Sequence, residues 1–261
     1  MLDAATLDRI AVQVAEAQAA PHTMPKLTDD FPGLDVEGGY DVQDRLLEKW
    51  SADGRELIGY KAGLTSKAKM EQMGVSEPSF GILMRDFVDC EGGVIPTQAM
   101  IHPRVEAEIA FVMKDELKGP DVTIDEILDA TEFVQPAIEI LDSRFEKFKF
   151  DLASVIADNG SAARFVLGGR PRRPRDLDLR TIGLVLERNG EIAALASSGA
   201  VLGHPAEAIR MMVSWLNARG RTLPAGSVVL TGGATEAIPV EAGDAVFARF
   251  QDMGEISVRF A

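Results

Sequence analysis

The first part of the chain carries apolar residues at helical spacing. Between Ala4 and Ala20 they recur every three or four positions, which is the period of one face of an α-helix. The apolar residues of this segment are Leu7, Ile10, Val14 and Ala17. After a loop that contains Pro21 and Pro25, the segment Val42–Trp50 shows the same period. We therefore expect a small helical region over residues 1–56.

The pattern changes at Leu57, where apolar runs become short, β-rich and separated by glycine or proline. Such runs predict strands, which we expect at Leu57–Tyr60, Val105–Met113, Phe133–Leu141, Ala163–Leu167, Thr181–Arg188, Ser227–Thr231 and Ala245–Phe250. Helices are expected at Ile124–Ala130, after a capping residue in Thr123, and at Pro205–Ala218. Strands in succession, with helices between only some of them, indicate an α+β protein or a mixed sheet curled on itself. We expect this second domain to span residues 57–261.

Composition and charge narrow the classes of function. The 261 residues include 27 Lys+Arg and 41 Asp+Glu, so the net charge is −14. Such an acidic chain is repelled by the phosphates of nucleic acid and by an anionic membrane, and we expect neither as a partner. A small anionic substrate remains compatible if a metal ion or a local basic cluster reverses the field at the site.

The sequence also bears on the compartment. Cys90 is the single cysteine, so an intrachain disulfide is excluded and a reducing environment is favoured. The chain has no apolar run of the roughly 18 residues that span a bilayer. The N-terminus does not have the pattern of a secretory signal, in which basic residues precede an apolar stretch. The expectation is a cytoplasmic protein.

Ile101–Val112 places two carboxylates in what reads as a buried strand. In a strand, Glu106 and Glu108 point to the same face, where the next residues are Ala110 and Val112. The opposite face is apolar. Two like charges side by side in such surroundings need a cation to neutralise them. A metal ion and a structural salt bridge with lysine or arginine both satisfy this condition.

A third acid, Glu139, lies among apolar residues in Phe133–Leu141. Three carboxylates in two strand-like segments favour one shared site over separate structural roles. Carboxylate oxygens with no neighbouring histidine or cysteine suit a hard divalent cation, Mg²⁺ or Mn²⁺, better than zinc.

Three further segments are candidates for the site. Lys61 lies between Gly59 and Gly63, and glycines allow a ligand to approach the backbone closely. The local sequence alone favours an exposed lysine there over an acid/base or anion-binding group. Val155–Ser161 predicts a polar turn, and Leu230–Gly233 a strand that opens into a glycine loop.

Together these motifs resemble the hydratase/decarboxylase branch of the fumarylacetoacetate hydrolase superfamily. The similarity covers nearly the whole chain and is carried by Gly59–Val75, His102–Val112, Pro136–Arg144, Ala157–Gly169, Leu202–Ala208 and Leu223–Gly233. It implies a distorted mixed β-roll that carries the site, with a small N-terminal helical domain packed against it.

The resemblance also implies roles for individual residues. Glu106, Glu108 and Glu139 are expected to bind one Mg²⁺ or Mn²⁺. Lys61 is expected to be a catalytic residue in the substrate pocket, contrary to the local sequence. Asp158, Ser161 and Thr231 are expected to line that pocket and bind substrate.

Three activities share this scaffold in the family: 2-oxopent-4-enoate hydratase, 2-oxohept-3-ene-1,7-dioate hydratase and 4-oxalocrotonate decarboxylase. Gly63–Val75 and Asp142–Phe150 resemble the decarboxylases most. The resemblance therefore implies metal-dependent loss of CO₂ from 2-oxohex-3-enedioate in meta-cleavage catabolism of aromatic compounds, with the two hydratase activities as alternatives. It further implies a homo-oligomer and a complex with 2-oxopent-4-enoate hydratase. The non-enzymatic alternative is a catalytically silent partner subunit.

Overall fold

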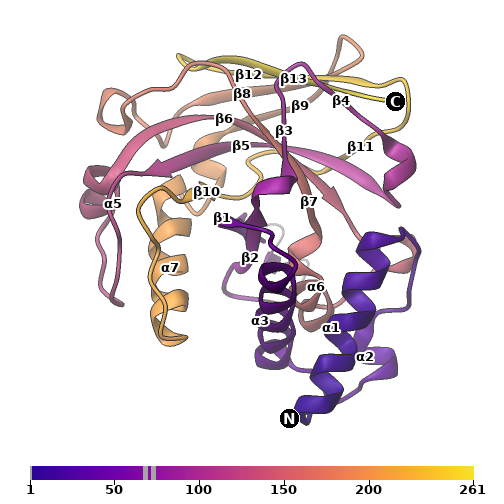
Figure 1. The fold of residues 1–261 in the computed structure, drawn as a ribbon. Coiled ribbons are helices and arrows are strands. Elements are labelled where there is room, and N and C mark those ends of the chain that lie inside the picture. Colours follow the sequence, from indigo (N-terminus) through magenta and orange to yellow (C-terminus); the bar gives the residue numbers. More distant parts are fainter. Residues whose placement is uncertain (1, 67–69, 72–74) are drawn as a thin grey trace.

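The computed structural model of the chain describes residues 2–66, 70–71 and 75–261. Residues 67–69 and 72–74 of the Gly59–Val75 motif lie outside the described residues. The fold consists of N-terminal helices followed by two sheets, which confirms the expected α+β class (Figure 1). Within the part of the chain that is described, no helix has the length and apolar character needed to cross a membrane.

The N-terminal layer is made of α1 (Ala4–Ala19), α2 (Leu27–Asp30) and α3 (Val36–Ala52). Asp3 begins α1 by accepting a hydrogen bond from the Thr6 N–H at 2.8 Å. Asp35 caps α3 in the same way through the Gly38 N–H. This cap lets α3 begin well before the expected Val42, although glycines at 38 and 39 lower the helix propensity. The first strand begins at Leu57, as expected. The division into two domains, residues 1–56 and 57–261, stays a prediction.

Two sheets, with helices inserted between some of their strands, form the rest of the fold. An eight-stranded sheet has the order β2-β1-β10-β5-β6-β7-β3, with β11 also paired to β5, and a five-stranded sheet has the order β4-β13-β12-β8-β9. The larger sheet contains β1 (Leu57–Gly63), β2 (Ser79–Met84), β3 (Val88–Asp89), β5 (Pro103–Met113), β6 (Thr131–Asp142), β7 (Ala162–Leu167), β10 (Val228–Leu230) and β11 (Ile238–Pro239). The smaller sheet contains β4 (Val94–Ile95), β8 (Gly183–Arg188), β9 (Glu191–Ser197), β12 (Ala245–Phe250) and β13 (Gly254–Phe260).

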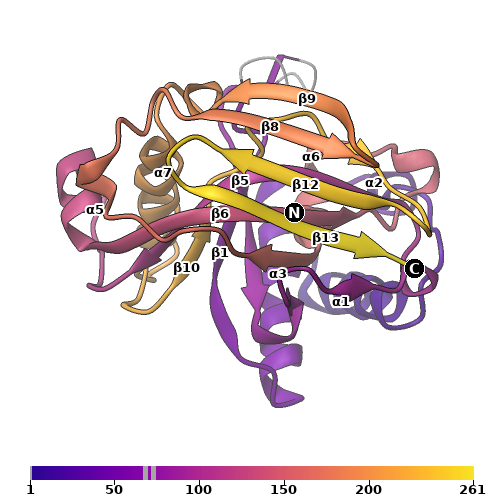
Figure 2. The same ribbon diagram turned by 90° about the horizontal axis from the view of Figure 1, so that it is seen from above.

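The central strands β5 and β6 are covered on both sides. The five-stranded sheet lies over them, and the helices lie below, with α7 (Pro205–Ala218) near β10 and α6 (Leu152–Ala157) near α3 (Figures 1 and 2). Alternate residues of β12, including Val246 and Ala248, are buried toward this core while Phe247 and Arg249 face solvent. Covering on both faces explains why β5 and β6 read as apolar on both sides.

Several expected elements differ in extent or were missed. Helix α5 (Ile124–Ala130) begins as expected, with a reciprocal capping box between Thr123 and Glu126. The strands β2, β9 and β13 were not expected. The expectation of a turn over Val155–Ser161 was wrong at its start, because Asp151 accepts a hydrogen bond from the Ser154 N–H and begins helix α6, which ends at Ala157. The turn itself is a single 3₁₀ turn at Asn159–Ser161.

Candidate metal centre and active site

Strand pairing brings three buried carboxylates together. Glu106 on β5 lies directly opposite Glu139 on β6, and Glu108 follows two residues along the same face. One ligand oxygen from each side chain lies within 4.8 Å of the others. All three residues are buried, Glu108 completely. We call Glu106, Glu108 and Glu139 the three-glutamate cluster.

Burying three carboxylates close together costs free energy unless a cation balances their charges. Burial, with the charges of Glu139 and Glu106 added to it, raises the pKa of Glu108 well above its ordinary value. Burial also raises the pKa of Glu139, and the nearby Lys61 ammonium opposes that rise. Glu108 Oε1 and Glu139 Oε2 have no hydrogen-bond partner. Buried polar atoms of this kind are rare in folded proteins and point to a ligand that is bound during function.

Lys61 on β1 reaches the cluster from a neighbouring part of the sheet. Its Nζ lies 3.2 Å from Glu139 Oε1 and donates a hydrogen bond to the Gly160 carbonyl at 2.9 Å. Only 3% of the residue is exposed. The local sequence favoured an exposed lysine, and that expectation was wrong because β1 is an inner strand, flanked by β2 and β10.

The turn after α6 is held in an unusual backbone conformation. Asn159, Gly160 and Ser161 all have positive φ, at 53°, 61° and 57°, which is costly for residues other than glycine. The Asn159 side chain accepts from the Ile82 N–H at 2.8 Å and donates to the Ile82 carbonyl at 2.9 Å. These bonds to β2 fix the turn so that the Gly160 carbonyl faces Lys61. A Cβ added at Gly160 would lie 3.3 Å from Lys61 Nζ.

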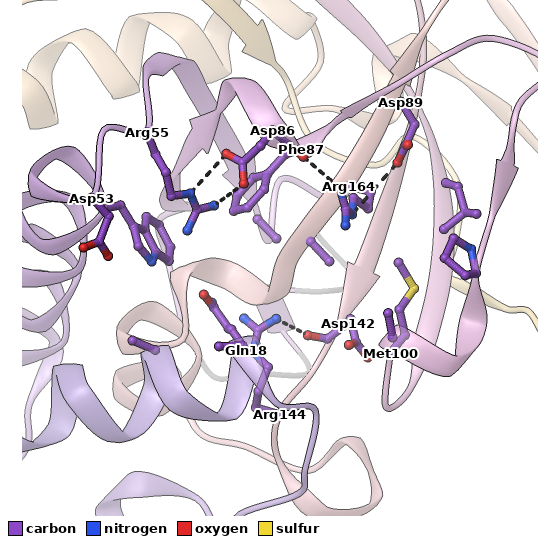
Figure 3. Close-up of a pocket in the computed structure, with 18 of the residues that line it drawn as sticks. Gln18, Asp53, Arg55, Asp86, Phe87, Asp89, Met100, Asp142, Arg144 and Arg164 are labelled. Carbon is purple, nitrogen blue, oxygen red and sulfur yellow. Dashed lines mark hydrogen bonds and ion pairs between the residues drawn. The ribbon is translucent and has the colours of Figure 1, made fainter.

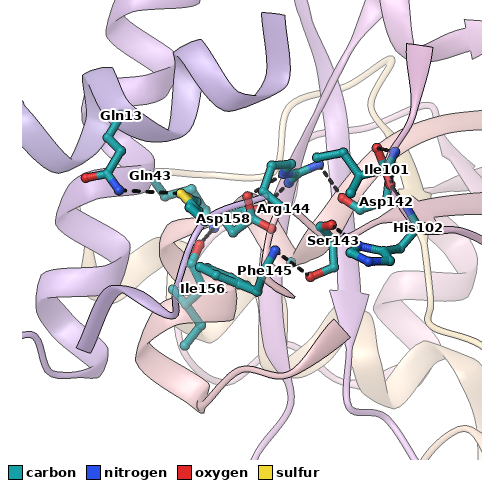
Figure 4. Close-up of polar contacts among 12 residues, drawn as sticks. Gln13, Gln43, Ile101, His102, Asp142, Ser143, Arg144, Phe145, Ile156 and Asp158 are labelled. Atoms are coloured by element: carbon teal, nitrogen blue, oxygen red, sulfur yellow. Dashed lines mark hydrogen bonds and ion pairs between the residues drawn. The ribbon is translucent and has the colours of Figure 1, made fainter. Parts of the chain in front are cut away.

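Asp158 sits at the base of this turn and pairs with Arg144 (Figure 4). Arg144 Nε donates to Asp158 Oδ1 at 2.5 Å, and its Nη2 donates to the Asp158 carbonyl at 2.6 Å. Burial raises the pKa of Asp158 to about 6, although the Arg144 charge opposes the rise. Asp158 Oδ2 and the buried Ser161 hydroxyl have no hydrogen-bond partner.

The loop after β10 contacts the cluster through its backbone. The Thr231 hydroxyl donates to the Ile109 carbonyl at 2.9 Å and anchors the start of the loop to β5. The next N–H, that of Gly232, donates to Glu108 Oε2 at 2.7 Å. A Cβ at position 233 would lie 2.0 Å from Glu106 Oε2. Glycine is therefore required there for the loop to approach the carboxylate.

Thr65 is a site residue that the sequence reasoning missed. It is 1% exposed, and its hydroxyl has no hydrogen-bond partner. A Cβ added at Gly232, the residue bonded to Glu108, would come within 2.1 Å of Thr65 Oγ1. A single threonine after β1 gives no local signal, because the residue that it packs against in the site, Gly232, is distant in sequence.

A cavity of about 430 Å³ lies elsewhere, between the N-terminal helices and the strands β3 and β7 (Figure 3). Arg55, Asp86, Arg144 and Arg164 are among the side chains around it. Neither Lys61 nor any member of the three-glutamate cluster lines it. The chemistry of the site therefore does not reside in this cavity.

The residues of the cluster fit a divalent cation. Three buried carboxylates supply hard oxygen donors, and unpartnered oxygens remain on Glu108 and Glu139. This donor set matches Mg²⁺ or Mn²⁺, while zinc favours histidine and cysteine.

Comparison with known proteins gives a consistent result. Residues 66–261 match the family model described as fumarylacetoacetate (FAA) hydrolase C-terminal. The chain is 47% identical over 251 residues to a 4-oxalocrotonate decarboxylase of Pseudomonas sp. (strain CF600), which covers 96% of this chain and 95% of that relative. It is 36% identical over 262 residues to a 2-hydroxyhexa-2,4-dienoate hydratase of Comamonas testosteroni, covering 100% and 99% of the two chains.

Among solved structures, the chain resembles that of a 4-oxalocrotonate decarboxylase from Pseudomonas putida G7 complexed with magnesium and adipate. The TM-score is 0.98 at 42% identity, and the match covers 100% of this chain and 99% of that chain. The same protein was also solved with calcium and acetate, with a TM-score of 0.96.

Proposed function

This chain belongs to the fumarylacetoacetate hydrolase family, and from that premise we propose that it is a metal-dependent decarboxylase of 4-oxalocrotonate (2-oxohex-3-enedioate). The products are CO₂ and 2-hydroxypenta-2,4-dienoate. The reaction belongs to the meta-cleavage catabolism of aromatic compounds. Its natural cofactor is Mg²⁺ or Mn²⁺.

The observation that carries the proposal is the three-glutamate cluster with Lys61 beside it. The relative solved with magnesium and adipate supports it further, because adipate is a six-carbon dicarboxylate with the chain length of 2-oxohex-3-enedioate. The identity of 47% to a decarboxylase, against 36% to a hydratase, favours loss of CO₂ over addition of water.

The substrate is a vinylogous β-keto acid, so the bond to the departing carboxylate is conjugated with the 2-oxo group. When that bond breaks, its electron pair moves through the C3=C4 double bond toward the carbonyl oxygen. Glu106, Glu108 and Glu139 would hold a divalent cation that supplies Lewis acidity at the 2-oxo end, where negative charge grows.

Lys61 acts beside this centre. Its ammonium is held between Glu139 and the Gly160 carbonyl, so it is fixed in direction before substrate binds. From there it orients the 2-oxo acid end and can donate a proton to the enolate oxygen as the enol product forms. Decarboxylation needs no general base to activate water, and the burial of the cluster keeps bulk water away from the developing charge.

The remaining residues divide into two groups. We assign the unpartnered hydroxyls of Ser161 and Thr65 to hydrogen bonds with substrate oxygens. We assign Asp158 and Thr231, whose side chains bond to Arg144 and to β5, to positioning the two loops that meet at the cluster.

We also propose a complex with 2-oxopent-4-enoate hydratase, whose substrate is the dienol released here. The product is an unstable enol, so direct transfer to the next enzyme would limit its isomerisation. Two relatives named as hydratases are each 36% identical to this chain, which supports related surfaces in such a complex.

The test is purified protein with 2-oxohex-3-enedioate, first with Mg²⁺ and then with EDTA, while CO₂ and the enol product are followed together. We expect CO₂ release that depends on Mg²⁺ and is lost in Glu106→Gln without loss of the fold. Addition of water without CO₂ would move the chain to the hydratases with the same site. No turnover, together with no thermal shift from Mg²⁺, would leave a catalytically silent partner subunit.

A further inference from the structure

Strand β5 carries an arginine on the same face as two of the metal-ligating carboxylates. Side chains alternate along a strand, so Arg104, Glu106 and Glu108 follow one another on the face that carries the three-glutamate cluster. Arg104 lies two residues from Glu106, which is about 7 Å along the strand at ~3.4 Å per residue. A cationic group therefore lies next to the cluster on this face of the sheet.

The Arg104 guanidinium packs on an aromatic ring and has no acidic partner. Its Cζ lies 4.1 Å from the centre of the Phe148 ring, within the range of a cation–π contact. Within the described residues, no carboxylate forms an ion pair with this half-buried guanidinium. The two other cations of the site are already paired, Lys61 with Glu139 and Arg144 with Asp158. Of these three cations, Arg104 alone keeps its hydrogen-bond donors for a ligand.

Phe148 is held in place at a cost to the backbone. Lys147 and Phe148 both have positive φ, at 56° and 57°, which is costly for residues other than glycine. The His102 ring meets the Phe148 ring edge-on, with 6.3 Å between their centres. His102 is itself anchored, because its Nδ1 lies 3.0 Å from the Ser143 carbonyl oxygen (Figure 4). Strained backbone that surrounding contacts hold in this way is typical of functional sites.

We propose that Arg104 binds the C6 carboxylate of the substrate and thereby selects six-carbon 2-oxo dicarboxylates over the corresponding monocarboxylates. The inference rests on the proposed function, in which the 2-oxo acid end of the substrate lies at the three-glutamate cluster. A six-carbon chain measures roughly 6 Å between its terminal carbons at ~1.5 Å per bond, which matches the spacing of Arg104 and Glu106 along β5. The planar guanidinium can hold a carboxylate through two parallel hydrogen bonds, which fixes the plane of the leaving group relative to the conjugated chain.

Arg104 contributes to substrate binding more than to bond breaking. The C6 carboxylate is an anion before reaction and leaves as neutral CO₂, while the electron pair of the C5–C6 bond moves through C3=C4 toward the C2 oxygen. The ion pair with Arg104 is therefore strongest before the bond breaks, and such an interaction lowers KM without raising kcat. Arg104→Gln should raise KM for 2-oxohex-3-enedioate by about 10–100-fold, whereas kcat should change little.

Two ligands that do not react test the contact without turnover. 2-Oxohexanedioate and 2-oxohexanoate differ only in the distal carboxylate, and neither has the C3=C4 double bond through which the electrons would move. Titration calorimetry with wild type in Mg²⁺ should show about 10–100-fold tighter binding of the diacid. The ratio should fall to about one in Arg104→Gln, and Arg104→Lys, which keeps the charge, should recover part of it.

Arg9→Gln is the matched control, because Arg9 also lies over an aromatic ring, that of Phe31, but in the N-terminal layer. It should keep the wild-type ratio, and every variant should keep the rise in melting temperature with Mg²⁺, which reports on the fold and the cation site. A preference for the diacid that persists in Arg104→Gln, or that wild type lacks, would overturn the proposal. A wild type that prefers the diacid through Arg104 yet releases no CO₂ from 2-oxohex-3-enedioate would refute the decarboxylase activity and support the contact.

Discussion

Replacing Glu108 with glutamine should make the metal-free protein more stable while removing its response to Mg²⁺. Glutamine keeps an oxygen that can accept the hydrogen bond from the Gly232 N–H and has nearly the same volume. It removes the charge that the cluster tolerates least, since Glu108 is completely buried and its pKa is raised well above the ordinary value.

The magnitude follows from the geometry. Ligand oxygens of the cluster lie within 4.8 Å of one another, and two unit charges at that distance repel by about 3.5 kcal/mol at an effective dielectric of ~20. Burial and the charges of Glu139 and Glu106 raise the pKa of Glu108, so the substitution removes the least favourable charge of the cluster. We therefore expect the free energy of unfolding to rise by about 1–3 kcal/mol in the variant, or roughly 2–12 °C in melting temperature for a chain of this size.

The effect should depend on pH in a defined direction. A carboxyl group whose pKa is raised on folding stabilises the native state below its unfolded pKa, and that stabilisation is lost as the pH rises through the folded pKa. Wild type should therefore lose stability from pH 5 to pH 8 more steeply than Glu108→Gln. The difference between the two proteins should be smallest at the acidic end.

Thermal unfolding in EDTA measures the stability of the metal-free protein, and unfolding in Mg²⁺ measures the stabilisation by the ion. Wild type should gain about 2.7 kcal/mol at a Mg²⁺ concentration of 100 times Kd, whereas the variant should gain little at the same concentration. Glu132→Gln, at an exposed position on the same strand as Glu139, is the matched control and should change neither quantity. A variant that is less stable than wild type in EDTA, yet still responds to Mg²⁺, would refute the electrostatic account of the cluster.

Three further substitutions address the surroundings of the cluster. Lys61→Met should lower kcat for CO₂ release by about 10²–10⁴-fold while Mg²⁺ still raises the melting temperature; full activity would exclude the lysine from the reaction. Thr65→Val should weaken kcat/KM by about tenfold, as expected for one lost hydrogen bond of ~1.4 kcal/mol, and Thr65→Ser should restore it; equal rates in both variants would remove Thr65 from the substrate pocket. Arg144→Met should lower the free energy of unfolding by about 3–5 kcal/mol in denaturant titration, because Asp158 is left buried and unpaired; a change below 1 kcal/mol would contradict a structural role for this pair.

The parts of the fold that the sequence predicted are those with a strong local signal. Helices α1, α5 and α7 were expected within one residue of their observed ends, since each has a capping residue and an apolar stripe. Strand β9 was missed because its run of alanines does not alternate, and β2 because a fully buried run of six residues has no period to detect. Their pairing is set by neighbours that are distant in sequence.

The site residues likewise divide into those with a local sequence signal and those placed by residues distant in sequence. Glu106, Glu108 and Glu139 could be recognised locally, because each places a charge in an apolar segment. Lys61 could not be assigned locally, because it is buried in an inner strand between β2 and β10, and the carbonyl that it bonds, that of Gly160, is about a hundred residues away. Thr65 gave no signal for the same reason: its position is defined by Gly232.

The apolar residues beside the glutamates are what place the carboxylates. Side chains alternate along a strand, so a slip of one residue between β5 and β6 would turn Glu139 toward the five-stranded sheet and bring Ile138 or Ile140 into the site. Both isoleucines are fully buried, and exposing them to the carboxylates would cost about 1.5–3 kcal/mol each. The core therefore holds the register that sets Glu106 opposite Glu139. The fold thereby keeps the three carboxylates within 4.8 Å of one another, which is the arrangement that a divalent cation needs.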